Sequence, residues 1–561
     1  MLARGFFAIL VTLGLTACCP AESLDGSWTL SWSATGERPA ADAKWESVTV
    51  PSLLFQRRET PFVWYTRSFT VPEEFTDRHV FLRFDAVRFV SEVYVNGKKV
   101  GRHYGGWEPF EVEITDACRI GQPNELLLRV QDVTGVIDQE IEAGKENASG
   151  RFIDQAEDSV MAPVGSQYSR VGIWKSVRLI ARNDVYIEDV FVQTSVRKHE
   201  LAADLALRNL SDREQTVHLA AHVEGTDVTL GEKEVTVPAG ASKTLSLKCG
   251  WADPQLWGPE NPHLYHLLTQ VTAGGKTLDQ AKTRFGFREF WIDGAVFVLN
   301  GTPMKFLATA GHPRGDLDNG LSKASAVDFY HRIREAGCVA MRLHANIWPK
   351  CWYEAADEVG MPIVFEAPLF CYARAYALSK PKFWENYHTH LEAVIRDHRN
   401  HPSIVMTSLE NEILHCGGER EPQTIPRLAE AGRLVKRLDP TRPILYDGDG
   451  DPEGVADVLN LHYPLPFDKQ NLWPQAGYWL ETGMEVACWP HKFWNWDRKK
   501  PLYFGEFLHL QHYREADPYT VFLGDEAYPS FNQAMARTKA MAWEMQIEAY
   551  RAAGVSGLCP W

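Results

Sequence analysis

The stretch SIVMTSLENE (residues 403–412) is an apolar run that ends on a carboxylate, Glu412. A second run, PLYFGE (residues 501–506), has the same form and ends on Glu506. Short apolar runs of this kind are typical of buried parallel strands, and (β/α)8 barrels place their reacting groups at the C-terminal ends of such strands. We therefore expect a barrel that presents Glu412 and Glu506 on one face.

A pair of carboxylates presented in this way suits the hydrolysis of a glycosidic bond. One carboxyl group must lend a proton to the leaving oxygen, and the other must attack or stabilise the sugar carbon. A glutamate is more often a solvated or salt-bridged surface residue. Two glutamates that each close a buried strand favour the chemical interpretation.

Around the two runs, the sequence alternates between segments typical of strands and segments typical of helices. Strands are expected at residues 304–310, 339–344, 362–367, 404–409, 444–447, 458–462, 502–505 and 554–561, and amphipathic helices at 324–336, 384–398 and 531–553. Eight strands with helical crossovers predict a (β/α)8 barrel over residues 288–561. The chain ends directly after the eighth expected strand and leaves no room for the last helix, which suggests a fragment of a longer protein.

Two β domains are expected before the barrel. In residues 23–182 the strands 80–84 and 125–130 flank a hairpin at 93–100, where Asn96-Gly97 favours a type I′ turn, and the polar stretch 138–158 is expected to be a loop. In residues 183–287 the segments 187–196, 217–223, 235–237 and 245–247 alternate apolar and polar residues, as in a small sandwich.

Composition limits the classes of function. The 561 residues are too long for one core, and 45% hydrophobic with 23% charged residues is ordinary for a soluble protein. The net charge of −15 argues against a nucleic-acid or anionic-membrane partner. The 19 tryptophans fit the stacking of sugars, although any one of them is more often core. The ten cysteines are irregularly spaced without a CxxC pair or a His/Cys cluster. They predict neither a disulfide framework nor a zinc site, and Cys338, Cys371 and Cys559 are interpreted as small buried hydrophobes.

The N-terminus is typical of an export signal. Arg4 precedes an apolar stretch at residues 5–15 that is too short to anchor in a bilayer, and Leu15-Thr16-Ala17-Cys18 resembles a bacterial lipobox. We expect residues 1–22 to be a lipoprotein-type signal with lipidation at Cys18; the alternative is an ordinary cleaved signal peptide. Either predicts an exported protein, periplasmic or anchored to the outer membrane. A lipid on Cys18 would be the protein's one contact with a membrane.

Several short sequence segments resemble those of glycoside hydrolase family 2, the group of β-galactosidases, β-glucuronidases and β-mannosidases. They occur in the family's order at residues 95–97, 105–110, 172–175, 256–262, 285–288 and 396–403. The resemblance implies a jelly-roll sugar-binding domain at 23–182, an immunoglobulin-like domain at 183–287 and a catalytic barrel at 288–561. It also implies that Glu412 is the general acid/base and Glu506 the nucleophile of a retaining mechanism, in which the carboxyl groups lie roughly 5–5.5 Å apart.

Further positions take roles from the same resemblance. Asn411 matches a residue that bonds the sugar 2-hydroxyl, and Arg342 one that keeps the nucleophile ionised, a role that a buried ion pair would share. Tyr463 resembles a hydrogen-bond partner of the nucleophile. The remaining matches are Trp561 as a floor for the sugar, and His344, His462 and His312 as contacts to hydroxyls or as structural histidines.

Some residues depart from the family pattern. Glu410 stands where a small residue is usual, Arg342-Leu343-His344 is one residue tighter than the familiar spacing, and residues 310–313 read AGHP. The acidic run at residues 447–451 lacks the glycine and distal glutamate of a calcium loop, so a solvated turn or a subsite edge is favoured.

The expected function is therefore exo-acting hydrolysis of oligosaccharides, with a β-galactoside as the default substrate and β-glucuronides and β-mannosides next. The alternative is a non-catalytic carbohydrate-binding lipoprotein. No cofactor is identified; a divalent cation would be compatible with the family, but no ligand set can be named. Oligomers are frequent in the family.

Overall fold

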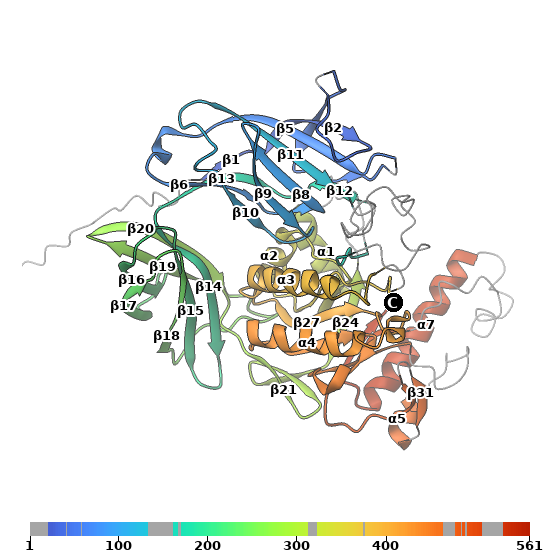
Figure 1. The fold of residues 1–561 in the computed structure, drawn as a ribbon. Helices are drawn as coiled ribbons and strands as arrows, with labels where there is room; N and C mark the ends of the chain where they lie inside the picture. Colours follow the sequence, from blue (N-terminus) through green and yellow to red (C-terminus); the bar gives the residue numbers. More distant parts are fainter. Residues whose placement is uncertain are drawn as a thin grey trace, which may run out of the picture.

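The computed structural model describes residues 21–40, 42–57, 59–132, 161–166, 170–311, 322–373, 376–463, 477–483, 485–488, 491–507 and 531–561. Three domains follow one another along the chain (Figure 1). A β-sandwich lies over a barrel, and a second β-sandwich lies beside both. The multidomain architecture expected from the sequence is therefore present. Cys18, His312 and the polar stretch 138–158 lie outside the described residues.

The first domain packs two antiparallel sheets around an apolar core. One sheet has the order β1 (Ala21–Ser23), β13 (Val177–Arg182), β6 (His79–Phe84), β10 (Phe110–Glu113), and the other β3 (Glu46–Val50), β2 (Gly26–Ser33), β5 (Phe62–Thr70), β11 (Pro123–Gln131), β8 (Val90–Val95), β9 (Lys98–Tyr104). A small sheet joins β4 (Leu54–Phe55), β12 (Arg170–Ile173) and β7 (Val87–Arg88). Asn96 and Gly97 both have positive φ between β8 and β9, as the type I′ hairpin requires. β1 begins at Ala21, so the first sheet already includes two residues of the segment 1–22.

The second domain is a smaller sandwich of alternating strands. Its sheets are β14 (Val185–Ser195), β15 (Glu200–Asn209), β18 (Ser242–Gly250) and β17 (Thr229–Val237), β16 (Gln215–Val223), β19 (Tyr265–Ala273), β20 (Lys276–Phe285). Along β16, Val217, Leu219, Ala221 and Val223 are buried while the residues between them face outward, which is the period of two that predicted these strands. A meander of β21 (Phe290–Asp293), β22 (Val296–Leu299) and β23 (Thr302–Met304) leads into the barrel.

All eight expected barrel strands are present and form a closed barrel. They are β24 (Phe306–Gly311), β25 (Ala340–Leu343), β26 (Ile363–Glu366), β27 (Ile404–Asn411), β28 (Ile444–Asp447), β30 (Leu459–His462), β33 (Leu502–Phe507) and β34 (Gly557–Pro560). The described helices are α1 (Lys323–Glu335), α2 (Lys350–Val359), α3 (Pro381–His398), α4 (Thr424–Leu438), α5 (Tyr478–Thr482) and α7 (Phe531–Ala552), with a β31 (Val486–Cys488) and β32 (His491–Trp494) hairpin before β33. Parallel strands covered on both faces are buried throughout, which explains why they read as continuous apolar runs.

The barrel departs from eight parallel strands at one place. A two-residue strand, β29 (Asp449–Gly450), runs antiparallel between β28 and β30 and pairs with both. Residues 448–458 are all described, and their only helical turn is the short η5 (Pro452–Gly454), so no α-helix makes this crossover. The chain between β28 and β30 is therefore folded back into the barrel wall.

Buried polar contacts fix the two sandwiches against the barrel. Glu108 accepts a 2.9 Å hydrogen bond from Nδ1 of His390 on α3, and Gly105 allows this close approach because a Cβ there would lie 1.9 Å from Glu108 Oε1. At the junction between the second domain and the barrel, Arg288 donates to the carbonyls of Pro402 and Ile404 at 3.0 and 2.6 Å. Ile404 is the first residue of β27, the strand that ends directly before Glu412.

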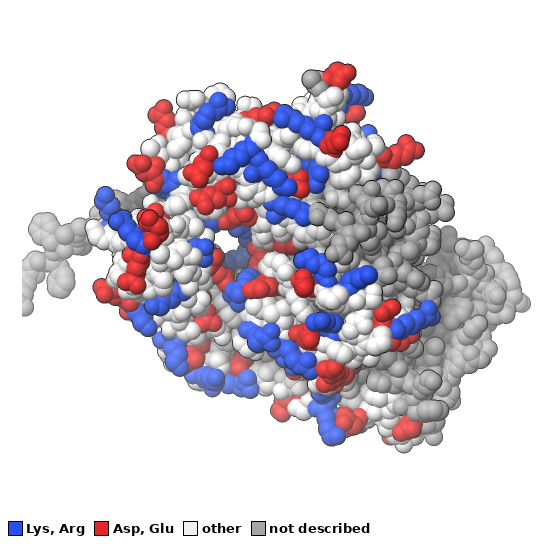
Figure 2. Space-filling view, in the orientation of Figure 1, with Lys and Arg blue, Asp and Glu red and all other residues white. Residues whose placement is uncertain are grey.

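The surface carries charges of both signs. On the face in Figure 2, lysine and arginine side chains lie among aspartate and glutamate side chains over all three domains. Charges of the two signs are thus interspersed on this face. Among the described residues, no helix has the length and apolar character needed to span a bilayer.

Candidate active site

The C-terminal ends of six neighbouring barrel strands converge on one polar cluster. Its members are Arg342 on β25, Glu366 on β26, Asn411 and Glu412 at the end of β27, Asp447 on β28, His462 on β30 and Glu506 on β33. Parallel strands bring their C-terminal ends to one face of the barrel, so these residues meet although they are far apart in sequence.

Glu506 is held as an ionised carboxylate by its neighbours. It is 3% exposed, and its Oε1 lies 2.8 Å from Nη1 of Arg342. The hydroxyl of Tyr463 donates to Oε2. Burial acts to raise the pKa of Glu506, but the positive charges of His462 and Arg342 outweigh it and hold the pKa well below its ordinary value. An ionised carboxylate in a dry setting is suited to act as a nucleophile.

Arg342 is the centre of the hydrogen-bond network. It is fully buried and donates to Glu366 from Nε at 2.6 Å and to the side-chain oxygen of Asn411 from Nη2 at 2.5 Å. Its Nε also lies 2.6 Å from Oδ2 of Asp447. Burial alone would lower the pKa of Arg342, but Asp447, Glu366 and Glu506 raise it well above its ordinary value. One cation therefore fixes carboxylates from three other strands.

Glu412 lies beside Glu506 in a more open position. Its side chain is 14% exposed, and one of its carboxylate oxygens lies within 4.8 Å of one from Glu506. The backbone N–H of Glu412 donates to the carbonyl of Asp447 at 2.8 Å. Glu412, Tyr463 and Ala345 all have left-handed backbone (φ of 56°, 43° and 44°) within two residues of the ends of barrel strands. Such conformations cost energy in residues other than glycine and are found most often at functional sites.

His462 bridges Glu412 and Asp447. Its Nδ1 lies 2.7 Å from Oε1 of Glu412, and its Nε2 lies 2.7 Å from Oδ1 of Asp447. Burial lowers the pKa of His462, but the charge of Glu506 and the bonds to Asp447 and Glu412 together raise it to about 10. The ring is therefore a cation near neutral pH. Both nitrogens donate, so neither has a lone pair for a metal ion.

Two more buried carboxyl groups support the turn after β27. Glu410 accepts from the N–H of Ile413 at 2.9 Å, and Asp449 accepts from the N–H groups of Leu414 and His415 at 2.6 and 3.0 Å. Burial raises the pKa of Asp449 to about 7, and burial with the nearby Asp449 charge raises that of Glu410 well above its ordinary value. Glu410 thus holds the loop that carries Glu412.

Comparison with known proteins agrees with this arrangement. Residues 47–183 match the sugar-binding domain of glycosyl hydrolases family 2, residues 185–288 match the family's central domain, and residues 292–511 match its TIM-barrel domain. The chain belongs to glycosyl hydrolase family 2. The order of the three family 2 domains is the order expected from the sequence.

Relatives in family 2 carry more than one name. A β-glucuronidase of Bacteroides fragilis is 28% identical over 396 residues, which are 68% of this chain and 53% of that protein. A β-galactosidase of Bacteroides ovatus is 25% identical over 499 residues, 78% of this chain and 55% of that protein. The chain thus spans about half the length of these two relatives.

Solved structures share the fold. A β-glucuronidase of Bacteroides uniformis superposes with a TM-score of 0.73 at 20% identity, over 97% of this chain and 65% of the other. A β-galacturonidase of Eisenbergiella tayi gives a TM-score of 0.73 at 19% identity, over 98% of this chain and 91% of the other. The barrel and both sandwiches therefore have the arrangement seen in solved family 2 structures.

The structure brings together the described residues that the sequence assigned to the site. His344 has its Nε2 3.4 Å from Oε1 of Glu506, and its ring centroid lies 4.8 Å from that of Trp561. Trp561 follows β34, and its N–H donates to the carbonyl of Phe507 at 3.2 Å. His344 therefore lies next to the carboxylate of Glu506, and the ring of Trp561 packs against His344.

The prediction that the acidic run at 447–451 forms a solvated turn is wrong. Asp447 and Asp449 are at most 1% exposed and do not form a solvated turn. Gly448 and Gly450 have positive φ, which lets the chain reverse into β29 and turn both carboxylates inward. Arg342 and His462 supply the charges that make this burial tolerable for Asp447.

Two kinds of residue were missed from the sequence. Glu366 is the last residue of a buried strand and Glu506 the last but one, so the rule that found Glu506 could have found Glu366. The cysteines were misjudged: Cys559 is buried as expected, but Cys338 and Cys371 are partly exposed. Sequence spacing gives no signal that Cys371 and Cys416 meet beside Glu412, because they lie in separate loops.

Proposed function

We propose that this chain is a retaining β-glycosidase in which Glu506 is the nucleophile and Glu412 the general acid/base. The observation that carries the proposal is the short separation of two carboxylates in unlike settings. Oxygens of Glu412 and Glu506 lie within 4.8 Å, which leaves no room for a water to attack from the opposite face of the sugar. Direct attack by one carboxylate, and hence retention of configuration, is favoured.

In the first step Glu506 attacks the anomeric carbon while Glu412 protonates the leaving oxygen. Glu506 is suited to attack because Arg342 and His462 keep it ionised. Glu412 is the more exposed of the two, as a group that meets leaving alcohol and water must be. In the second step Glu412 takes a proton from water, and the resulting hydroxide displaces Glu506 from the sugar.

The surrounding residues position these two groups. Tyr463 and Arg342 each bond a different oxygen of Glu506, which fixes the plane of its carboxylate. Arg342 also engages the side-chain oxygen of Asn411. The amide nitrogen of Asn411 is then the group that can donate to a sugar 2-hydroxyl, a contact that strengthens in the transition state.

For the substrate we propose a terminal β-linked neutral sugar, with β-galactosides first. A glucuronide would need a cation for its carboxylate. Among the described residues of the cluster, Arg342 and His462 are the cations, and both already pair with protein carboxylates. Relatives are named both β-galactosidase and β-glucuronidase, so β-glucuronides are the second candidates and β-mannosides the third.

The deciding experiment is hydrolysis of a panel of aryl β-glycosides by wild type and by Glu506→Gln. We expect one sugar to be cleaved with retention, as seen by NMR of the first-formed anomer, and the variant to lose about 10⁴-fold or more in kcat. Glu419→Gln, an exposed change on the nearby η4 turn (Gly418–Arg420), is the matched control. An inverted product, or no cleavage of any sugar, contradicts the proposal; binding of sugars without cleavage identifies a carbohydrate-binding protein.

We also propose that the protein is exported and anchored through a lipid on Cys18, because residues 15–18 resemble a lipobox. Cell fractionation of wild type and Cys18→Ser tests this. Release of the variant from the membrane fraction is expected, and equal fractionation of both proteins contradicts the anchor.

A further inference from the structure

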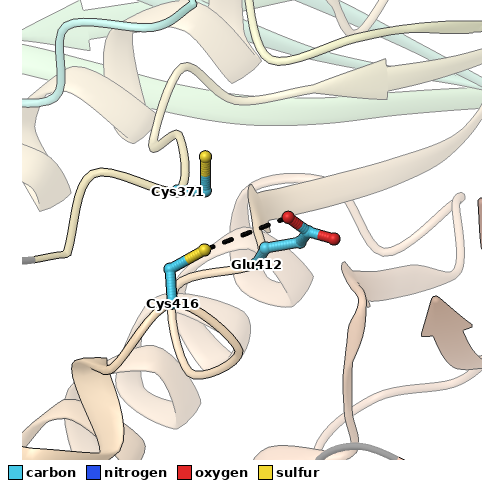
Figure 3. Close-up of side chains that lie close together, drawn as sticks. All are labelled: Cys371, Glu412 and Cys416. Carbon is cyan, nitrogen blue, oxygen red and sulfur yellow. Dashed lines mark hydrogen bonds between the residues drawn. The ribbon is translucent and has the colours of Figure 1, made fainter. Parts of the chain in front are cut away.

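Two cysteines flank the carboxylate of Glu412. Cys371 lies in the loop after β26, and Cys416 lies in the turn after β27, four residues beyond Glu412. The Sγ atoms of both cysteines and a carboxylate oxygen of Glu412 all lie within 4.8 Å of one another. Figure 3 shows the three side chains, with the contact between Cys416 and Glu412 dashed.

We propose that Cys371, Cys416 and Glu412 form a binding site for a thiophilic divalent cation of the zinc class, and that the bound cation blocks hydrolysis. Two thiolates and a carboxylate are ligands that Zn²⁺ accepts, whereas Mg²⁺ and Ca²⁺ require oxygen ligands throughout. Water would take the fourth position.

The distances suit such an ion. Zinc bonds of about 2.3 Å to sulfur and 2.0–2.2 Å to oxygen place the ligand atoms of a tetrahedron roughly 3.5–3.8 Å apart. Sγ of Cys416 lies 4.0 Å from Oε2 of Glu412, so these two ligands need to close by only a few tenths of an ångström. All three residues are partly exposed, which gives the ion a path from solvent.

The turn that carries two of the ligands is held rigidly. The N–H of Cys416 donates to the carbonyl of Glu412 at 2.9 Å, and that of Gly418 donates to Ile413 at 2.8 Å. A Cβ at Gly418 would lie 2.6 Å from the Ile413 carbonyl oxygen, so the tight turn requires glycine there. The buried carboxylates of Glu410 and Asp449 accept hydrogen bonds from the N–H groups of the three residues 413–415.

The third ligand is held by the neighbouring strand. The N–H of Asn411 donates to the carbonyl of Leu369 at 2.9 Å, which ties the loop of Cys371 to the end of β27. The N–H of Gly165, from the first domain, donates to Pro368 in the same loop at 2.8 Å. Both loops are thus positioned before an ion arrives, which reduces the entropy that binding must overcome.

Binding would disable the proposed acid/base. The ion occupies Oε2 of Glu412 while Oε1 remains bonded to His462, so neither oxygen can protonate a leaving group. Coordination requires both thiols to lose their protons, so binding releases protons and strengthens with pH. The inhibitory effect rests on the proposed role of Glu412, whereas the binding site does not.

Co²⁺ is a direct probe because tetrahedral Co²⁺ with thiolate ligands absorbs strongly in the near ultraviolet and visible. The whole chain, with its thiols reduced, is titrated with Co²⁺ and then with Zn²⁺. We expect one equivalent of Co²⁺ to give a thiolate charge-transfer band that Zn²⁺ removes. Cys371→Ser, Cys416→Ser and the double variant should lose the band, and Cys118→Ser, a partly exposed cysteine of the first domain, should keep it.

Zinc inhibition of aryl glycoside hydrolysis gives the second readout. The double variant should need at least about tenfold more Zn²⁺ for half inhibition than wild type or Cys118→Ser. A Co²⁺ band that survives in the double variant, no band in the wild type, or equal zinc inhibition of all proteins overturns the proposal. A cysteine-dependent band in a chain that cleaves no glycoside supports the metal site and contradicts the proposed function instead.

Discussion

Nδ1 of His462 lies 2.7 Å from Oε1 of Glu412, so a buried imidazolium is bonded to the more exposed of the two paired glutamates. The other side of the ring is bonded to Asp447, which keeps its orientation fixed. A charged donor at this distance can follow the change of charge on Glu412 between the two halves of a double displacement. Among the residues around the glutamate pair, we therefore expect the removal of His462 to impair turnover.

Replacing His462 with glutamine keeps a hydrogen-bond donor and removes the positive charge. We expect kcat to fall about 100-fold or more because a preorganised charge beside the reacting groups is lost. Steady-state kinetics on the best aryl glycoside measure this, with His331→Gln on the exposed face of α1 as the control. A loss of less than about threefold would mean that the charge of His462 has no part in turnover.

Arg342→Lys should move the acid side of the pH profile. The wild-type pKa of Glu506 is depressed by His462 and Arg342, so this proposed nucleophile is ionised even in mild acid. Lysine cannot reproduce the forked contacts of the guanidinium, so the pKa of Glu506 should rise. The acid limb of kcat/KM is then expected about one pH unit or more higher. Arg83→Lys in the first domain is the control, and an unmoved limb would contradict this role.

Glu412→Ala should slow the two chemical steps unequally. An aryl glycoside with a good leaving group needs little protonation, so the glycosyl-enzyme should form and then accumulate because no base activates water. A burst of released aryl alcohol is the expected signal. Added azide, which needs no general base, should restore turnover and give a β-glycosyl azide. Recovery of an α-glycosyl azide would contradict this assignment and would mean that Glu412 is the nucleophile and Glu506 the acid/base.

Glu410→Gln should stabilise the protein at neutral and higher pH. The native pKa of Glu410 is raised well above its ordinary value, and that of Asp449 is raised to about 7. The stability that each protonated form gives the fold is therefore complete below about pH 4, and it is lost as the pH rises toward the native pKa of the group. Glutamine keeps an oxygen for the N–H of Ile413 and cannot ionise. The gain in unfolding free energy should be on the order of 1–3 kcal/mol at pH 8 and near zero at pH 4. Denaturant unfolding at both pH values measures it, and a pH-independent difference would exclude an ionisation effect.

Sequence patterns located the barrel because its physics is local. A buried parallel strand must be apolar along its whole length, so strands such as β27 and β33 stand out without any knowledge of their neighbours. The glutamates that close them were identified for the same reason. The hairpin at Asn96 and Gly97 followed from φ preferences alone.

The rest of the site depends on which strands become neighbours. An aspartate-rich run such as 447–451 looks solvated when its surroundings are unknown, and only the nearby Arg342 and His462 make burial of Asp447 possible. The meeting of Cys371 with Cys416 likewise depends on two loops from adjacent strands. Contacts of this kind arise from closure of the barrel and leave no periodic trace in either segment.

The guanidinium of Arg342 contacts residues on four other strands, namely Glu366, Asn411, Asp447 and Glu506. No one of these residues can change without leaving a buried charge or amide unmatched. Substitutions can therefore change the sugar specificity of this protein far more readily than the buried residues around Arg342. A different sugar would be accommodated by changes in the loops above the strands, while the residues of the proposed catalytic centre stay the same.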